Sequence, residues 1–311
     1  MKRPFGTHPH QRLQLLIRVA YDGADFFGVP VQPHGRTVSD ALFRRLTEAF
    51  RHPPKGLAWA ARTDQGVHAL ANYATCWFPI GSVDEEDVEQ PFLDLMVPRE
   101  DGLLRVEVRK VGFHTHARAL GEGKRYRYRV QPGVPADEVA ALADLPRPRP
   151  DRPLPRPPPP IWRTWQVPVA LDLPAMRLAA AQLSGLHDLR AFGTKPFGDQ
   201  PTVRRLHAVT VEPAVGPQGQ HLVIEVLGEG FLRNMVRIFA GTLAEVGAGL
   251  RDPGCVARAL ASGVREDAGM TAPSRALTLV ELLGSLLPEG AEPWAPSPDP
   301  ADGPLQAEGG D

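Results

Sequence analysis

The sequence predicts an α+β fold, in which helices cover antiparallel or mixed β-sheets. Two observations support this prediction. Apolar runs typical of strands and stretches with helical spacing recur in each half of the 311-residue chain, in an order close to β-α-β-β-α-β. The two kinds of element do not alternate strictly, which favours antiparallel or mixed sheets over a parallel α/β arrangement.

The first half is expected to contain one strong helix among several strands. The helix begins after Thr37, because apolar residues recur at helical spacing through residues 38–50 and Asp40 occupies the capping-box position. In KRYRYRV, at 124–130, basic residues alternate with aromatic or apolar ones, so one face of that strand is cationic and the other can pack. The other expected strands are LQLLIRVAYDG at 13–23, which ends in an Asp-Gly turn, NYATCWF at 72–78 and LLRVEVRKV at 103–111.

The second half repeats this pattern. A helix is expected at 172–186, with Asp172 as its N-cap and Pro174 in its first turn. The stretch 231–250 is apolar nearly all round, so its helix should be buried on most sides. The remaining expected elements are a short helix at 253–262 and strands at 202–213, 220–230 and 276–283, the first two at hairpin spacing.

The two halves are separated by PRPRPDRPLPRPPPP at 146–160, which cannot be a helix or a central strand. The expected organisation is therefore an N-terminal half at 1–132, a Pro/Arg-rich linker or insertion at 133–160, and a C-terminal half at 161–287. An acidic tail at 288–311 has the composition of a disordered segment.

Composition narrows the class of protein. Hydrophobic residues make up 42% and charged residues 23%, which is typical of a soluble globular chain. Only two cysteines are present, Cys76 and Cys255, and they are far apart, so the sequence favours neither a disulfide framework nor a zinc site. A reducing, cytoplasmic location follows as the expectation. The sequence shows no signal peptide, and no run of about 18 apolar residues predicts a membrane span.

The formal net charge of −1 conceals an uneven distribution. Six acids and no Lys or Arg follow Leu287, and removing these six negative charges from the total leaves +5 for the rest of the chain. An arginine-rich body is compatible with a phosphate-bearing partner such as RNA. Solvated surface arginines would give the same composition.

Familiar catalytic motifs are missing from the sequence. It contains no P-loop, no Gly-rich dinucleotide fingerprint and no Gly-x-Ser-x-Gly elbow. On a strand, His114 and His116 would share one face, as metal ligands often do, but no third ligand accompanies them and a role without metal is favoured.

The remaining candidates are one loop acid, two tyrosines and one arginine. Asp64 lies in WAARTDQGVHAL at 59–70, two residues after Arg62. A carboxylate beside a cation stays ionised and can act as a nucleophile or general base, although the same residues also suit an ordinary surface turn. The other candidates are Tyr126, Tyr128 and Arg237.

Seven motifs follow one another in an order that resembles the bacterial tRNA pseudouridine synthase A family. They are AYDGADFFG with TVSDAL, ARTDQGVHALANYATCWF, FHTHARALGEGKRYRYRV, GLHDLRAF, TVRRL, GEGFLRNMVRIFAGTLAEVGAG and AGMTAPSRAL. The resemblance covers about residues 15–283. The loop around Asp64 is similar to the family's G-R-T-D-A-G-V-H-A, with Ala61 and Gln65 as its two departures.

The resemblance implies a fold and a reaction. The fold is the pseudouridine synthase fold, with two ferredoxin-like α/β halves whose mostly antiparallel sheets join and whose active site lies in the cleft between them. The reaction is the isomerisation of uridine to pseudouridine at nucleotides 38–40 of the tRNA anticodon arm, without cofactor or metal. The family forms homodimers in which one tRNA contacts both subunits, and no membrane is involved.

The resemblance also assigns site residues. Asp64 matches the catalytic aspartate, which either attacks C1′ as a nucleophile or removes a proton from C2′. Tyr126 is suited to stack on the uracil, and Arg237 is expected to pair with Asp64. Arg62 is suited to contact RNA or hold the flipped nucleotide, and His68 of the same motif is expected to bind substrate.

Departures from the family pattern affect the substrate more than the chemistry. Val29 and Pro30 replace a usual Trp-Gln, residues 119–121 are Ala-Leu-Gly where the family has F-S-A, and TAPSRAL replaces a T-A-P-A-x-G-L pattern. Two alternatives therefore remain. One is a pseudouridine synthase of the same fold that acts on another RNA site, and the other is a non-catalytic RNA-binding descendant.

Overall fold

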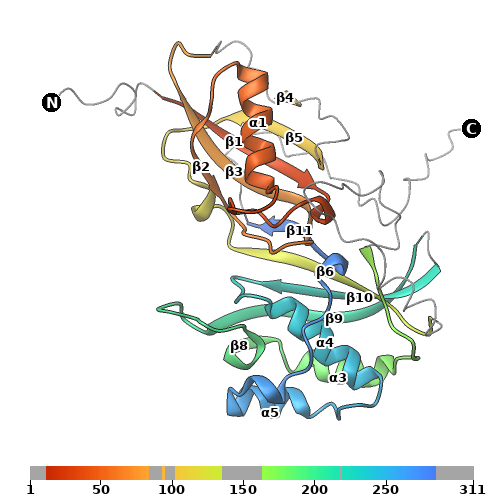
Figure 1. The fold of residues 1–311 in the computed structure, drawn as a ribbon. Helices are drawn as coiled ribbons and strands as arrows, with labels where there is room; N and C mark the ends of the chain where they lie inside the picture. The colour runs from red at the N-terminus through yellow and green to blue at the C-terminus, as the bar shows by residue number, and fades with distance from the viewer. Residues whose placement is uncertain (1–11, 84–92, 95–101, 135–162, 217–218, 285–311) are drawn as a thin grey trace, which may run out of the picture. The chain divides into compact units, whose positions relative to one another are not determined.

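The computed structural model describes residues 12–83, 93–94, 102–134, 163–216 and 219–284, and its chain forms two compact units (Figure 1). The first unit contains the described residues up to Glu122 and those from Leu279 onward, and the second runs from Gly123 to Thr278. The proline-rich stretch at 146–160 and the acidic tail lie outside the described residues.

The first unit is built on a sheet in the order β4-β5-β1-β3-β11, with β2 also paired to β3. Neighbours β4 and β5, β5 and β1, β1 and β3, and β2 and β3 are antiparallel. The strands are β1 (Arg12–Tyr21), β2 (Lys55–Trp59), β3 (His68–Pro79), β4 (Leu93–Asp94), β5 (Leu103–Lys110) and β11 (Leu277–Leu283).

Helix α1 (Val38–Phe50) lies across one face of this sheet (Figure 1). It begins where the sequence predicts, because the Thr37 side chain accepts the N–H of Asp40 and the Asp40 carboxylate accepts the N–H of Thr37. Its apolar stripe, which includes Leu42 and Leu46, is fully buried. The predicted capping box and amphipathic helix are thus both confirmed.

The second unit is built on strands in the order β6-β10-β9-β8, all antiparallel, with the short β7 parallel to β6. Helices α3 and α4 pack against each other and cover this sheet (Figure 1). The elements are β6 (Gly123–Gln131), β7 (Trp165–Gln166), α3 (Leu173–Ala181), β8 (Gly185–Asp188), β9 (Val203–Gly216), β10 (Gly219–Gly228), α4 (Met235–Gly247) and α5 (Cys255–Ser262). A mixed, mostly antiparallel sheet with helices confirms the α+β prediction.

The alternating sequence of strand β6 gives the strand two different faces. Tyr126 and Tyr128 lie opposite Val226 and Ile224 of β10, so they belong to the packed face of the sheet. Arg127 points to the other face, where its guanidinium binds Glu225 at 3.0 Å. The predicted division into a packing face and a cationic face is confirmed, with an acid on the neighbouring strand to balance the cation.

Two local predictions were wrong. The helix expected at 231–250 begins only at Met235, because Asn234 has a left-handed φ of 62° that breaks the helical backbone. The helix at 172–186 has the predicted N-cap, Asp172, but ends at Ala181, and a strand follows.

In the described part of the chain, no helix is long and apolar enough to cross a bilayer.

Candidate active site

The loop that joins β2 to β3 in the first unit presents Asp64. Arg62 is exposed, Thr63 is buried at 4% exposure, and Asp64 is half-buried. The Asp64 backbone carbonyl accepts a hydrogen bond of 3.2 Å from the N–H of Val67, which closes a tight turn around Gly66 with its φ of 80°. The loop thus places an exposed arginine and a half-buried aspartate on either side of one buried threonine.

Thr63 is anchored through both its side chain and its backbone. Its hydroxyl lies 2.9 Å from the hydroxyl of Tyr21, at the end of β1, and its carbonyl accepts the N–H of Val29 at 3.1 Å. Tyr21 is fully buried, and burial raises its pKa to about 12. The Tyr21 hydroxyl therefore keeps its proton at neutral pH.

Asn72 of β3 holds the start of the same loop. Its side-chain amide donates to the carbonyl of Ala61 at 2.9 Å and accepts the N–H of Ala61 at 3.3 Å. The same amide nitrogen donates to the Tyr21 hydroxyl at 3.2 Å. Asn72 is fully buried, so these bonds satisfy a polar group that would otherwise be costly inside the sheet.

Two glycines allow the loop to lie against the turn that follows β1. A Cβ placed on Gly23 would lie 2.1 Å from the carbonyl oxygen of Val67. A Cβ on Gly28, whose φ is 92°, would lie 2.9 Å from the carbonyl oxygen of Thr63. Side chains at these two positions would push the Asp64 loop away, which gives the glycines of AYDGADFFG a physical reason.

His68 lies at the start of β3 and is only 1% exposed. Its Nδ1 is 3.1 Å from the N–H of Gly23 and 3.0 Å from a carboxylate oxygen of Asp22, which is equally buried. His68 is therefore shielded from solvent in this structure. Its expected contact with substrate stays a prediction.

In the second unit, Tyr126 presents its ring beside a second aromatic. Its ring centroid is 5.0 Å from that of Phe231, with the planes at 81°, a favourable edge-to-face contact. Lys124 stands two residues earlier on the same face of β6, and burial lowers its pKa. The sequence analysis did not single out Lys124, although its spacing from Tyr126 is the period of a strand.

Arg237 lies in the first turn of α4, the expected apolar helix. Its Nε donates to the carbonyl of Ala272 at 2.7 Å, and one terminal nitrogen donates to the side-chain oxygen of Asn234 at 2.8 Å. The Asn234 amide in turn donates to the hydroxyl of Thr194 at 3.0 Å. Arg237 belongs to the second unit and Asp64 to the first. The pairing of these two residues stays a prediction.

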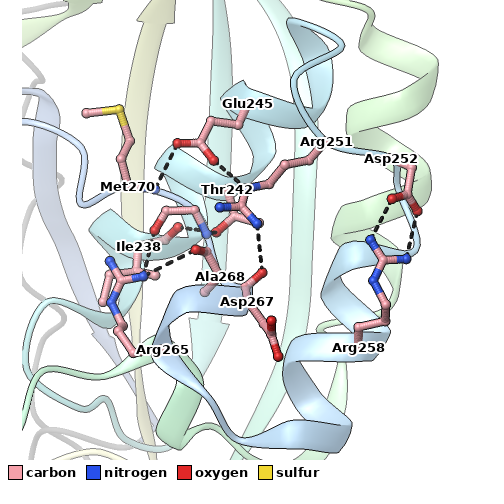
Figure 2. Close-up of polar contacts among 11 residues, drawn as sticks. Ile238, Thr242, Glu245, Arg251, Asp252, Arg258, Arg265, Asp267, Ala268 and Met270 are labelled. Carbon is pink, nitrogen blue, oxygen red and sulfur yellow. Dashed lines mark hydrogen bonds and ion pairs between the residues drawn. The ribbon is translucent and has the colours of Figure 1, made fainter.

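The segment that binds Arg237, residues 268–273, is itself held on α4 (Figure 2). The N–H of Gly269 donates to the hydroxyl of Thr242 at 2.8 Å, and the N–H of Met270 donates to Glu245 at 3.0 Å. Backbone and helix approach so closely that a Cβ on Gly241 would lie 1.9 Å from the Met270 carbonyl oxygen.

Two arginines complete this arrangement (Figure 2). Arg265 donates to the carbonyl of Gly269 at 2.7 Å and to the hydroxyl of Thr271 at 3.2 Å. Arg251 binds Glu245 at 2.5 Å and the carbonyl of Asp267 at 3.0 Å. The segment before Ala272 is therefore fixed by side chains as well as by packing, which limits the positions open to the Arg237 guanidinium.

Among the described residues, no group of three or more His, Cys, Asp or Glu side chains is arranged to hold a metal ion. His116 instead caps the short 3-10 helix Ala117–Ala119, where its Nδ1 accepts the N–H of Arg118.

Comparison with known proteins identifies the family to which the chain belongs. Residues 179–282 match the family model described as tRNA pseudouridine synthase, which places the chain in a class of RNA-modifying isomerases. Three curated relatives extend the match over most of the chain, and each carries the name tRNA pseudouridine synthase A. The chain belongs to the tRNA pseudouridine synthase A family.

The coverage of these relatives is nearly complete. The protein of Geotalea uraniireducens is 34% identical over 269 residues, which cover 86% of this chain and 98% of the relative. That of Halalkalibacterium halodurans is 36% identical, with coverage of 84% and 89%. That of Lacticaseibacillus casei is 32% identical, with coverage of 86% and 97%.

Proposed function

We propose that this chain isomerises uridine to pseudouridine at nucleotides 38–40 of the tRNA anticodon stem-loop. The single observation that carries the proposal is the Asp64 loop, in which buried contacts to Thr63 and Ala61 hold a half-buried acid between the buried Thr63 and the exposed Gln65. The relatives named tRNA pseudouridine synthase A support the choice of tRNA as substrate.

The reaction breaks the bond between C1′ and N1, turns the uracil and forms a bond between C1′ and C5. The proton lost from C5 is balanced by the proton gained at N1, so no oxidant or reductant is needed. We assign Asp64 as the group that acts at the ribose, with nucleophilic attack on C1′ as its step. Closure of the site against water would protect the intermediate, in which the glycosidic bond is broken, from hydrolysis.

Tyr126 and Arg237 have complementary roles in this proposal. The Tyr126 ring, braced edge-to-face by Phe231, offers a surface on which uracil stacks while it turns. The Arg237 guanidinium pairs with Asp64 and aims it. Arg62 is exposed beside Asp64 and contacts the RNA backbone or the flipped nucleotide, whose extrusion costs a few kcal/mol.

We further propose that the protein acts in the cytoplasm as a homodimer, with one tRNA in contact with both subunits. Stem recognition then relies on shape and phosphate contacts, because side chains cannot read the deep major groove of an RNA helix. Sedimentation at micromolar concentration tests the assembly, and a monomer would refute it.

The activity is tested with unmodified tRNA transcripts that carry uridine at positions 38, 39 and 40. We expect pseudouridine at these positions after incubation, mapped by chemical modification and primer extension. Transcripts with cytidine at all three positions provide the control. Pseudouridine elsewhere in tRNA or in ribosomal RNA, with none at 38–40, would favour a synthase of different site specificity, and binding without any product would favour a non-catalytic RNA-binding protein.

A further inference from the structure

We propose that Tyr21 and Asn72 are positioning residues for the isomerisation, which set the direction in which Asp64 is presented. The inference rests on the proposed role of Asp64. It is carried by a buried hydrogen-bonded chain that joins two strands of the first unit to the backbone on the N-terminal side of Asp64.

The directions of the hydrogen bonds follow from the inventory of donors. The Asn72 amide nitrogen can only donate, so the Tyr21 hydroxyl oxygen accepts at 3.2 Å. The Tyr21 hydroxyl proton is then available for the Thr63 hydroxyl oxygen, 2.9 Å away. The high pKa of Tyr21, about 12, keeps that proton in place throughout the neutral range.

The hydrogen bonds of Tyr21 and Asn72 hold the loop at two points on the N-terminal side of Asp64. Asn72 binds both the N–H and the carbonyl of Ala61, and Tyr21 binds the side chain of Thr63. Arg62, between these two points, remains exposed. The backbone that leads to Asp64 is therefore held in a fixed position, while the Arg62 side chain remains exposed.

Burial alone does not explain this arrangement. An apolar pair of similar shape at positions 21 and 63 would avoid the desolvation of two hydroxyl groups at little cost in stability. A directional hydrogen bond instead specifies where the loop lies. Misplacement of a catalytic group by about 1 Å can lower the rate by about 10²-fold, so a small error in this loop matters more for turnover than for folding.

The test compares three substitutions in the full-length protein. Thr63→Val and Tyr21→Phe each remove one partner of the 2.9 Å hydrogen bond and keep the side-chain shape. Thr75→Val is the matched control, because Thr75 is also a buried threonine of the first unit, and its hydroxyl accepts one backbone bond from Ala117. Thr63→Val and Thr75→Val should lose similar amounts of stability in urea, and Tyr21→Phe should lose more, because it also removes the acceptor of the bond from Asn72.

We expect Thr63→Val and Tyr21→Phe to lower kcat on a tRNA transcript by about 10-fold or more, with KM little changed. Thr75→Val should retain the wild-type kcat. Because the first two variants break the same bond, the double variant should lose no more kcat than the worse single variant. Equal kcat for Thr63→Val and Thr75→Val, or a wild-type kcat for Tyr21→Phe, would overturn the inference.

Hydrogen exchange of the loop amides separates this inference from the proposed function. We expect Tyr21→Phe to accelerate exchange at Val67, whose N–H binds the Asp64 carbonyl, and Thr75→Val to leave it unchanged. Unchanged exchange in Tyr21→Phe would refute the positioning role even if the wild type proved inactive on tRNA. Inactivity of the wild type on every tRNA transcript would instead refute the proposed function.

Discussion

The Nε of Arg237 donates a hydrogen bond of 2.7 Å to the carbonyl oxygen of Ala272, thirty-five residues further along the chain. A second bond, to Asn234, fixes the plane of the guanidinium. These two bonds fix the position of the guanidinium at the start of α4.

This orientation predicts that charge and shape at position 237 both matter. We expect Arg237→Met to lower kcat by about 10²-fold or more, the usual cost of removing a preorganised electrostatic contact. Arg237→Lys should retain partial activity, because it keeps the charge but cannot bind Ala272 and Asn234 in the same planar geometry. Single-turnover rates on a tRNA transcript measure both, with circular dichroism as the check on folding. Wild-type turnover in Arg237→Met would eliminate this residue and leave Arg62 as the next candidate partner for Asp64.

The segment that binds Arg237 provides a second prediction. Arg265→Met removes the bonds to Gly269 and Thr271, so we expect residues 268–273 to loosen and kcat to fall by about 10-fold. Arg258→Met is the matched control, because Arg258 is exposed and pairs with Asp252 at the surface (Figure 2). An exposed pair of this kind contributes little to stability. Equal kcat for the two variants would show that the segment needs no support from Arg265.

The two faces of β6 and the start of α1 could be predicted from the sequence, because both depend on local signals. The capping box at Thr37 and the alternation in β6 are each contained in a few adjacent residues. The start of α4 could not be predicted in this way. Apolar periodicity continues through Phe231 and Leu232, and only the left-handed backbone of Asn234 ends it.

The candidate site, too, contains one part that the sequence predicts and one part that it does not. The motif containing Asp64 stands out in the sequence, whereas the residues that hold it do not. Tyr21 and Asn72 lie within largely buried strands, where they resemble ordinary core positions. Tyr21 meets Thr63, and Asn72 meets Tyr21 and Ala61, only after β1 and β3 pair. Contacts over 42 and 51 residues have no local pattern in one sequence. Asn72 is one of three buried polar residues in β3, with His68 and Thr75, and was an available signal, since a buried amide needs hydrogen-bond partners.

Asp64 itself is tested by a change of charge at constant size. We expect Asp64→Asn to lower turnover by on the order of 10⁴-fold or more, as when a catalytic nucleophile is removed. Binding of tRNA should be largely retained, because the amide keeps the loop intact. Asp199→Asn is the control, since it removes one exposed negative charge from the second unit. Pseudouridine formation by Asp64→Asn at a rate near that of the wild type would refute the assignment.

Tyr126 combines a ring with a hydroxyl, and two variants separate them. Tyr126→Phe keeps the edge-to-face contact with Phe231 and the stacking surface, so tRNA binding should survive. If the hydroxyl assists proton loss at C5, kcat should fall by about 10²-fold, the usual scale of general acid–base catalysis. Tyr126→Ala removes the ring as well. Loss of kcat in Tyr126→Ala but not in Tyr126→Phe would restrict the residue to stacking.

Alkaline pH should weaken the first unit through its buried tyrosines. Burial raises the pKa of Tyr21 and of Tyr73 to about 12, from an ordinary value of 10.0. Between these two values the unfolded chain releases the phenolic proton while the folded chain retains it. The unfolded state then binds fewer protons, so the free energy of unfolding decreases as pH rises, by up to about 1.4 kcal/mol per pH unit for each group.

The variant Tyr21→Phe isolates one of these two contributions. At pH 7 both phenols are neutral, and the wild type should be the more stable protein because it retains the hydrogen bonds of Tyr21. As pH rises above about 10 the wild type loses stability faster than Tyr21→Phe, so the difference between them should shrink. Urea unfolding at intervals from pH 7 to pH 11 measures this difference. A constant difference across the series would show that Tyr21 ionises as readily in the folded protein as in the unfolded chain, and that the hydroxyl beside Thr63 is accessible to water.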